Sequence, residues 1–169
     1  MRDAREFDAF YAASSRRVLG QLYAMTGDRS EAEDAVAEAY LRAWDRWSTV
    51  RDCASPEAWV RQVAYRTAVG SWRKAVNRLR AHRRDAVAPD RDGLGPDHVA
   101  LVHALRQIPA EQRRVIVLHH LVGLSIDEIV AEVDAPAGTV KARLARGRRA
   151  LALHLMDTEE YALGASGHG

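Results

Sequence analysis

Apolar side chains recur at three- and four-residue intervals along most of the chain, and the alternation typical of strands is nearly absent. This pattern predicts a first helix over residues 7–25, which the "TGD" sequence then ends. A second helix is predicted to begin at Ser30, because Ser30 and Glu33 have the spacing of a capping box. The fold class is therefore expected to be all-α.

Two further features complete the first part of this pattern. The second helix is expected to bury an apolar stripe formed by Val36, Tyr40, Trp44 and Trp47. A third long helix is predicted from Pro56 to about Arg80, with Ser55 as its N-cap. Pro56 suits the first helical position, where the N–H that proline lacks would have no partner anyway.

A break in the periodicity divides the chain. Residues 81–96, "AHRRDAVAPDRDGLGP", combine prolines, glycines and mixed charges without any apolar period. We therefore predict two small helical domains, residues 5–80 and 97–156, joined by a flexible linker over 81–96. The polar, glycine-rich residues 157–169 are predicted to be a loose tail.

The second domain carries the pattern of a helix-turn-helix. Two helices are predicted first, one ending at the "QIP" sequence and one over residues 110–121. Ser125 and Glu128 then form a second capping box, which starts a short helix that ends near Val133. The "DAPAG" sequence is the turn, and a last helix is predicted over residues 136–155.

This last helix crowds positive charge around an apolar stripe. The stripe is expected to seat the helix on the short helix before it and consists of Val140, Leu144 and Leu151. The free face can then enter a DNA major groove, where we assign Arg146 to a base edge and Arg143 to phosphate, and leave Lys141 open. A solvated charged helix in an ordinary bundle is the alternative interpretation.

Charge is segregated along the chain, although the formal net charge is only +2. Residues 30–45 are rich in acidic side chains, whereas residues 59–84 carry Arg and Lys and no acidic residue. Such segregation suggests two partners, one basic and one acidic. Trp72 is equally consistent with a core position and with stacking on unpaired bases, while Trp59 is expected in the core.

Little in the sequence indicates catalysis, a disulfide or a membrane. Cys53 is the only cysteine, which excludes an internal disulfide and a cysteine-rich zinc site. His119 and His120 point about 100° apart on a helix, so they do not readily share a ligand. We expect no enzyme, no metal site and no cofactor. Without a signal peptide or an apolar span, we expect a cytoplasmic protein.

Three stretches in order along the chain resemble the extracytoplasmic-function (ECF) sigma factors, initiation subunits of bacterial RNA polymerase. "EAEDAVAEAYLRAW" (31–44) is similar to the family's second conserved region. "AWVRQVAYRTAVGSWRK" (58–74) resembles the helix that recognises and opens the promoter −10 element. "ALRQIPAEQRRVIVLHHLVGLSIDEIV" and "GTVKARLARGRRAL" are similar to the fourth region, which binds the −35 element. The "SWRK" and "HHLVGLS" sequences look most like an actinobacterial subgroup.

The resemblance implies core RNA polymerase and promoter DNA as partners. An anti-sigma factor is a further partner that the family allows. No membrane insertion is implied. In the family, the acidic helix docks on the clamp helices of the polymerase β′ subunit. That role carries over to Glu33, Asp34 and Glu38, with Tyr40, Leu41 and Trp44 on the packed side.

The resemblance also implies two DNA-binding sets. The −10 strand is expected to meet the loop 51–55 and the polar face of the next helix, through Arg51, Arg61, Arg66, Trp72, Arg73 and Lys74. The −35 element is expected to meet Thr139, Lys141, Arg143, Arg146 and Arg149. Arg66 and Ala142 depart from the residues common in the family, so the promoter preference of relatives does not carry over.

A stand-alone helix-turn-helix repressor or activator is the alternative from a different class of function. Such a regulator needs neither an acidic docking helix nor a −10-like helix, which argues against it. A structural bundle without a nucleic-acid partner is a weaker third interpretation. Binding to core polymerase separates the sigma factor from both.

Overall fold

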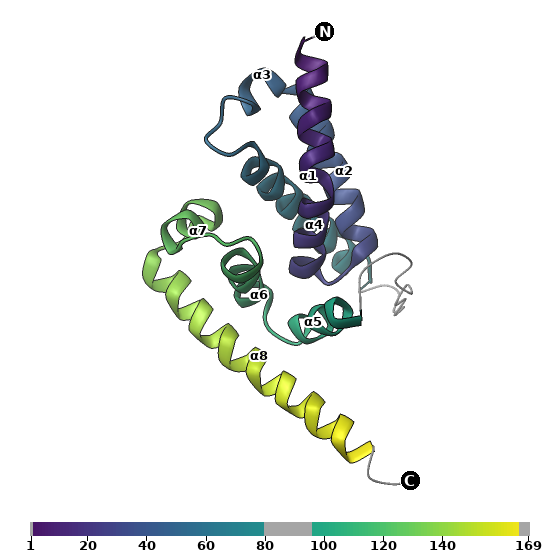
Figure 1. Cartoon of the computed structure of the whole chain (residues 1–169), viewed down its shortest axis with the longest axis vertical. Coiled ribbons are helices and arrows are strands. Elements are labelled where there is room, and N and C mark those ends of the chain that lie inside the picture. Colours follow the sequence, from purple (N-terminus) through teal and green to yellow (C-terminus); the bar gives the residue numbers. More distant parts are fainter. Residues whose placement is uncertain (1, 80–95, 166–169) are drawn as a thin grey trace. The chain divides into compact units, whose positions relative to one another are not determined.

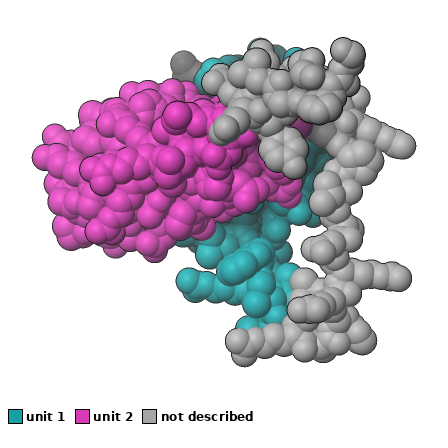
Figure 2. Space-filling view, turned by 90° about the horizontal axis from the view of Figure 1, so that it is seen from below, with its two compact units in different colours: residues 1–93 teal, residues 94–169 magenta. Residues whose placement is uncertain are grey.

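The computed structural model describes residues 2–79 and 96–165. These residues form helices with short connections and contain no strand, which confirms the all-α prediction. The chain divides into two compact units, residues 1–93 and 94–169, coloured separately in Figure 2. The predicted linker, residues 81–96, lies outside the described residues except for Pro96.

The first unit packs helices around one apolar core (Figure 1). Its elements are α1 (Arg2–Thr26), α2 (Arg29–Asp45), α3 (Trp47–Val50) and α4 (Pro56–Leu79). The helices α1, α2 and α4 each contact the other two. Their facing stripes bury Val18, Leu22, Met25, Val36 and Val60. Because each helix buries one stripe, its remaining faces are left to charged side chains.

The start of α2 differs from the prediction. Gly27 has a φ of 74°, which glycine adopts without strain, and it turns the chain out of α1. Asp28 then caps α2, and its carboxylate accepts a hydrogen bond from the Glu31 backbone N–H at 2.9 Å. Ser30 lies inside the first turn, so the predicted Ser30–Glu33 capping box is wrong. Two good capping residues compete here, and the residue directly after the turn prevails.

The start of α4 is as predicted. Pro56 is its first residue, and the Ser55 hydroxyl accepts a hydrogen bond from the Ala58 backbone N–H at 3.2 Å. This cap fixes where the basic helix begins. The loop before it is therefore held between two ordered elements, α3 and α4.

An aromatic cluster closes one end of the first unit. Phe7 and Phe10 of α1 each lie 5.2 Å from Trp47 between ring centroids. The Tyr40 hydroxyl is hydrogen-bonded to Ser14 at 2.7 Å in the interior, and burial raises the pKa of Tyr40. The prediction placed Trp47 on the stripe of the second helix. It lies on α3 instead, because α2 ends at Asp45.

The second unit is built around a long final helix (Figure 1). Its elements are α5 (Pro96–Arg106), α6 (Ala110–Ile116), the π-helical turn η1 (Val117–Leu121), α7 (Ile126–Val133) and α8 (Ala137–Ala165). The helix α8 contacts α5, α6 and α7. The core between them buries Leu105, Val115, Leu118, Ile129, Val140 and Leu144.

The helices α6 and α8 approach closely at Gly147. A Cβ atom at Gly147 would lie 2.9 Å from the Cγ1 atom of Ile116, a separation that Cβ atoms essentially never show. The missing side chain therefore sets the spacing of the two helices. This contact holds the basic part of α8 against α6.

The helix-turn-helix has the predicted local structure. The Ser125 hydroxyl accepts a hydrogen bond from the Glu128 N–H at 3.2 Å, and the Glu128 carboxylate accepts one from the Ser125 N–H at 2.7 Å. The capping box is therefore confirmed. Asp134 adopts a left-handed conformation with φ of 54° and ends α7.

One predicted helix end in this unit is wrong. The helix predicted over 110–121 does reach Leu121, but its last turn, η1, is π-helical, and the Val122 N–H bonds the carbonyl of Val117, five residues back, at 3.0 Å. The last helix continues to Ala165, so the predicted loose tail is helical over 157–165. Good helix formers, mainly Ala, Leu and Glu, dominate this stretch and outweigh its glycine.

Replacing Asp28 by Ala is expected to lower the free energy of unfolding of the first unit by about 1 kcal/mol, because a first-turn N–H loses its acceptor. Ser30→Ala, the matched control, is expected to change it by less than about 0.5 kcal/mol. All four tryptophans lie within residues 44–72, so their fluorescence during a urea titration reports the first unit. Equal losses in both variants would contradict the assignment of the cap to Asp28.

Candidate functional site

One exposed face of α2 combines acidic and apolar side chains. Asp34, Glu38 and Leu41 follow one another at four- and three-residue spacing and so share a face. Leu41 is 63% exposed, and Trp44 beside it is 45% exposed. Tyr40 points the other way into the core. Of the three side chains expected on the packed side, the helix therefore buries Tyr40 and turns Leu41 and Trp44 outward.

The acidic residues of α2 differ in how far the chain neutralises them. Glu33 pairs with Arg29, and Glu38 pairs with Arg42, each at 2.9 Å. Within the described ranges, Asp34 forms no ion pair. Of these three residues, Asp34 therefore keeps the charge that is most available to a basic partner.

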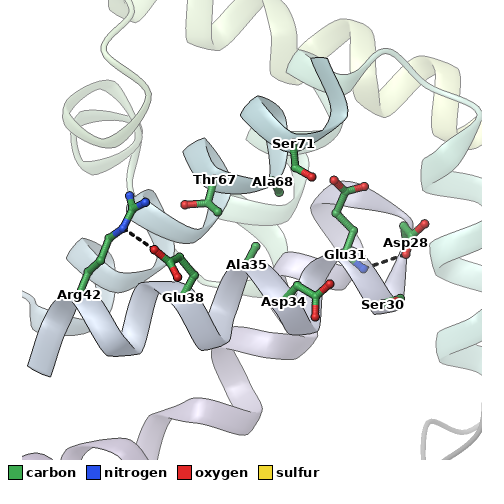
Figure 3. A pocket seen from close by; sticks show the side chains of 10 residues that line it. All are labelled: Asp28, Ser30, Glu31, Asp34, Ala35, Glu38, Arg42, Thr67, Ala68 and Ser71. Atoms are coloured by element: carbon green, nitrogen blue, oxygen red, sulfur yellow. Dashed lines mark hydrogen bonds and ion pairs between the residues drawn. The ribbon is translucent and has the colours of Figure 1, made fainter. Parts of the chain in front are cut away.

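A groove runs beside this face, between α2 and α4 (Figure 3). Figure 3 shows the carboxylates of Glu31, Asp34 and Glu38 spaced along α2, with Thr67 and Ser71 of α4 on the opposite wall. The acidic surface therefore extends from the cap of α2 to the middle of the helix. Negative charge of this density disfavours phosphate and suits a basic protein surface.

Some of the basic residues of α4 are exposed as predicted, and Arg61 is not. Arg66 and Arg73, seven residues apart, lie on one exposed face, and Trp72 and Lys74 flank it. Trp72 is 60% exposed, which excludes a position in the core. Trp59, expected in the core, is only half-buried.

Arg61 lies apart from this basic surface. Its side chain is 3% exposed, and its Nη1 donates to Oε1 of Gln21 on α1 at 3.2 Å. The reason is periodicity: Arg61 follows Val60 and lies three residues before Ala64, on the face that α4 buries. Arg61 therefore takes no part in the exposed surface predicted for −10 DNA.

Arg51 is engaged by the start of α1. Its Nη1 lies 2.5 Å from Asp3 and 3.6 Å from Glu6, and Asp52 is also within ion-pair distance. The hydrogen bond that Arg51 donates to Asp3, followed by the charge of Asp3, raises the pKa of Arg51. No local pattern predicts this contact, because Arg51 and Asp3 lie 48 residues apart in the sequence.

The first half of α8 exposes a basic face. Lys141, Arg146 and Arg149 are exposed, while Val140 and Leu144 are buried against the neighbouring helices. Thr139, Arg143 and Arg146 share one side of the helix by their spacing. A groove between this side and the start of α6 is lined by Pro109, Glu111, Gln112, Gly138, Thr139, Ala142, Arg143 and Arg146.

Arg143 is paired across this groove. Its Nη2 lies 3.0 Å from Oε2 of Glu111 in the first turn of α6, and the two side chains are 25% and 73% exposed. Sequence reasoning missed Glu111, because no local pattern links it to α8. The packing of α6 on α8 alone brings the two residues together.

The histidine pair serves local structure. Nδ1 of His119 is hydrogen-bonded to the Leu124 carbonyl at 2.9 Å, and Nε2 of His120 accepts from Nε of Arg148 at 3.1 Å. Burial, followed by the charge of Arg148, lowers the pKa of His120. Across the part of the chain that the structure describes, no group of three or more His, Cys, Asp or Glu is placed to hold a metal ion.

No helix among the described residues is both long enough and apolar enough to span a bilayer. The exposed apolar side chains of α2 are flanked by charges, as at a surface that meets another protein.

Comparison with known proteins matches two regions of the chain to one family. Residues 10–84 match Sigma-70 region 2, and residues 98–151 match Sigma-70 region 4. The ECF RNA polymerase sigma factor SigL of Mycobacterium tuberculosis is 34% identical over 140 residues, 79% of each chain. The ECF RNA polymerase sigma-E factor of Escherichia coli is 30% identical over 167 residues, which cover 88% of this chain and 86% of that protein.

The fold is also that of a solved sigma factor. RpoE of Bartonella quintana, crystallised with the anti-sigma factor NepR, superimposes with a TM-score of 0.79 at 21% identity, over 90% of this chain and 98% of that one. The region 2 match contains α2 and α4, and the region 4 match contains the helix-turn-helix. The chain therefore belongs to the ECF RNA polymerase sigma factors of the sigma-70 family, and its function is promoter-specific initiation of transcription.

Proposed function

We propose that this sigma factor docks on core RNA polymerase through the exposed face of α2, contacts −10 DNA through α4 and binds −35 DNA through α8. The observation that carries the proposal is the separation of charge among these helices. Acidic and apolar side chains share one exposed face of α2, whereas α4 and the first half of α8 each expose a cluster of Arg and Lys side chains. Different helices can therefore bind a protein partner and a nucleic acid.

The α2 face has the composition of a protein-docking surface. Leu41 and Trp44 offer exposed apolar area next to the unpaired charge of Asp34. DNA phosphates would be repelled here, whereas a basic helix of the polymerase would be attracted and oriented. The β′ clamp helices, implied by the family, fit this chemistry.

The exposed face of α4 suits single-stranded DNA. Trp72 can stack on an unpaired base, while Arg66, Arg73 and Lys74 attract the backbone. Arg61 is excluded from this set because it is buried. Arg51 can contact the DNA only if the DNA displaces Asp3 and Glu6 from its guanidinium.

The −35 surface is the exposed side of α8. Lys141, Arg146 and Arg149 extend from the helix, and the small residues Gly138 and Ala142 allow a close approach of the DNA. In a major groove, these cations can meet guanine acceptors or phosphate oxygens. Thr139 lies at the helix start, where backbone N–H groups favour a phosphate.

The remaining parts of the proposal follow from the family. We infer that the protein is not an enzyme and that it acts in the cytoplasm, where the polymerase works. An anti-sigma factor is a plausible regulator, since the sigma factor of similar fold from Bartonella quintana was solved with one. The alternative, a stand-alone repressor or activator, leaves region 2 without a role.

Reversing two charges, Asp34→Lys with Glu38→Lys, is expected to weaken binding to core RNA polymerase about tenfold or more, a loss of about 1.4 kcal/mol or more. The reason is that two attractive contacts become repulsive. The measurement is a fluorescence titration of core enzyme, followed by run-off transcription. Asp127→Lys, an equivalent change on α7, is the control and is expected to leave core binding unchanged. A double variant that binds core as tightly as the wild-type protein refutes the docking surface.

Replacing Trp72 by Ala is expected to weaken binding of a single-stranded −10 oligonucleotide to the holoenzyme by about 1–3 kcal/mol, because a stacking platform is lost. Trp72→Phe is the matched control and is expected to retain most of the affinity, since it keeps an aromatic ring. Anisotropy of a labelled oligonucleotide measures both. If the Ala variant binds like the wild-type protein, Trp72 does not contact the strand.

A further inference from the structure

The Glu111–Arg143 pair is an unusual feature of a DNA-binding surface. Of the residues predicted to bind the −35 element, only Arg143 forms an ion pair within the described part of the chain. Its partner, Glu111, is 73% exposed and stands at the edge of the groove that Arg146 and Thr139 also line. An exposed carboxylate at this place opposes phosphate binding, so its presence calls for another use.

The pair contributes little to folding. Ion pairs between exposed groups stabilise proteins by about 0–1 kcal/mol, and Glu111 is largely in solvent. Glu111 also lies in the first turn of α6, where a negative charge is mildly favourable. Neither effect requires that the carboxylate reach across to the recognition helix.

The geometry restricts Arg143 more than its neighbours. One terminal nitrogen of its guanidinium, Nη2, lies 3.0 Å from Oε2 of Glu111, and the Arg143 side chain is 25% exposed. The planar group has five N–H donors in a fixed arrangement, so the donors that remain are oriented. The pair has little net charge, which reduces attraction to phosphate but leaves directional hydrogen bonding intact.

We propose that Glu111 is a positioning residue that orients Arg143 toward a base edge of the −35 element. Arg143 then reads a base instead of holding phosphate, which revises its sequence-based assignment. The small side chains at Gly138 and Ala142, on the same groove, leave room for a base edge to come near. This inference rests on the proposed binding of −35 DNA by α8.

The experiment uses the full chain with core polymerase and a promoter library randomised at the −35 element. The proteins compared are the wild type, Glu111→Ala, Glu111→Gln, Arg143→Ala and the double variant Glu111→Ala with Arg143→Ala. Asp127→Ala, which removes a first-turn carboxylate from α7, is the charge-matched control. Transcripts are sequenced to obtain the base preference at each position, and helical content is checked by circular dichroism.

The expected results separate positioning from charge. Arg143→Ala relaxes the preference at one −35 position about tenfold. Glu111→Ala relaxes the same position, and Glu111→Gln relaxes it less, because the amide oxygen still accepts a hydrogen bond. The double variant matches Arg143→Ala, since Glu111 acts through the arginine. Binding to unrelated duplex DNA does not weaken in Glu111→Ala, because one repulsive charge is gone.

Three outcomes overturn the positioning role: an unchanged base preference in both Glu111 variants, a further change when Glu111→Ala is added to Arg143→Ala, or the same relaxation in Asp127→Ala. The second would assign a direct base contact to Glu111, and the third a general effect of charge. A wild-type protein without preference at any −35 position would instead refute the proposed function, and the positioning role with it. Glu111→Gln keeps the test decisive if the Ala variant does not fold.

Discussion

A helix that buries one stripe of side chains fixes the direction of all its others, and the surfaces of this protein depend on that constraint. On α2, burial of Val36 and Tyr40 turns Asp34 to the outside. On α8, burial of Val140 against its neighbours turns Arg146 outward. The apolar core and the charged surfaces are thus two sides of the same helices.

Contacts within the protein then decide which charges a partner can use. Arg61 is buried in the core and donates a hydrogen bond to Gln21, so its charge is not exposed to a partner. Arg51 is held by the acidic start of α1, so DNA must compete for it. Asp34, in contrast, keeps its exposed charge. Fewer charged side chains are therefore available to a partner than the sequence alone suggests.

The first unit exposes surfaces of opposite charge on adjacent helices. The acidic groove lies between α2 and α4, and α4 also exposes Trp72 and its neighbouring cations toward another side. In the proposed function, the bundle meets a protein with one helix and an unpaired strand with the next. Packing of the two helices would then couple the position of the strand to the docked polymerase.

The sequence by itself determined the helices, the Ser55 and Ser125 caps and the helix-turn-helix, because these depend on residues within a few positions of one another. Local signals failed where two of them competed, as at the start of α2, and where helix formers outweighed glycine in the last helix. The side-chain partners of Arg61 and Arg143 were decided by the tertiary structure alone. Their partners, Gln21 and Glu111, lie on other helices, and only the packing of those helices brings the side chains within hydrogen-bonding distance.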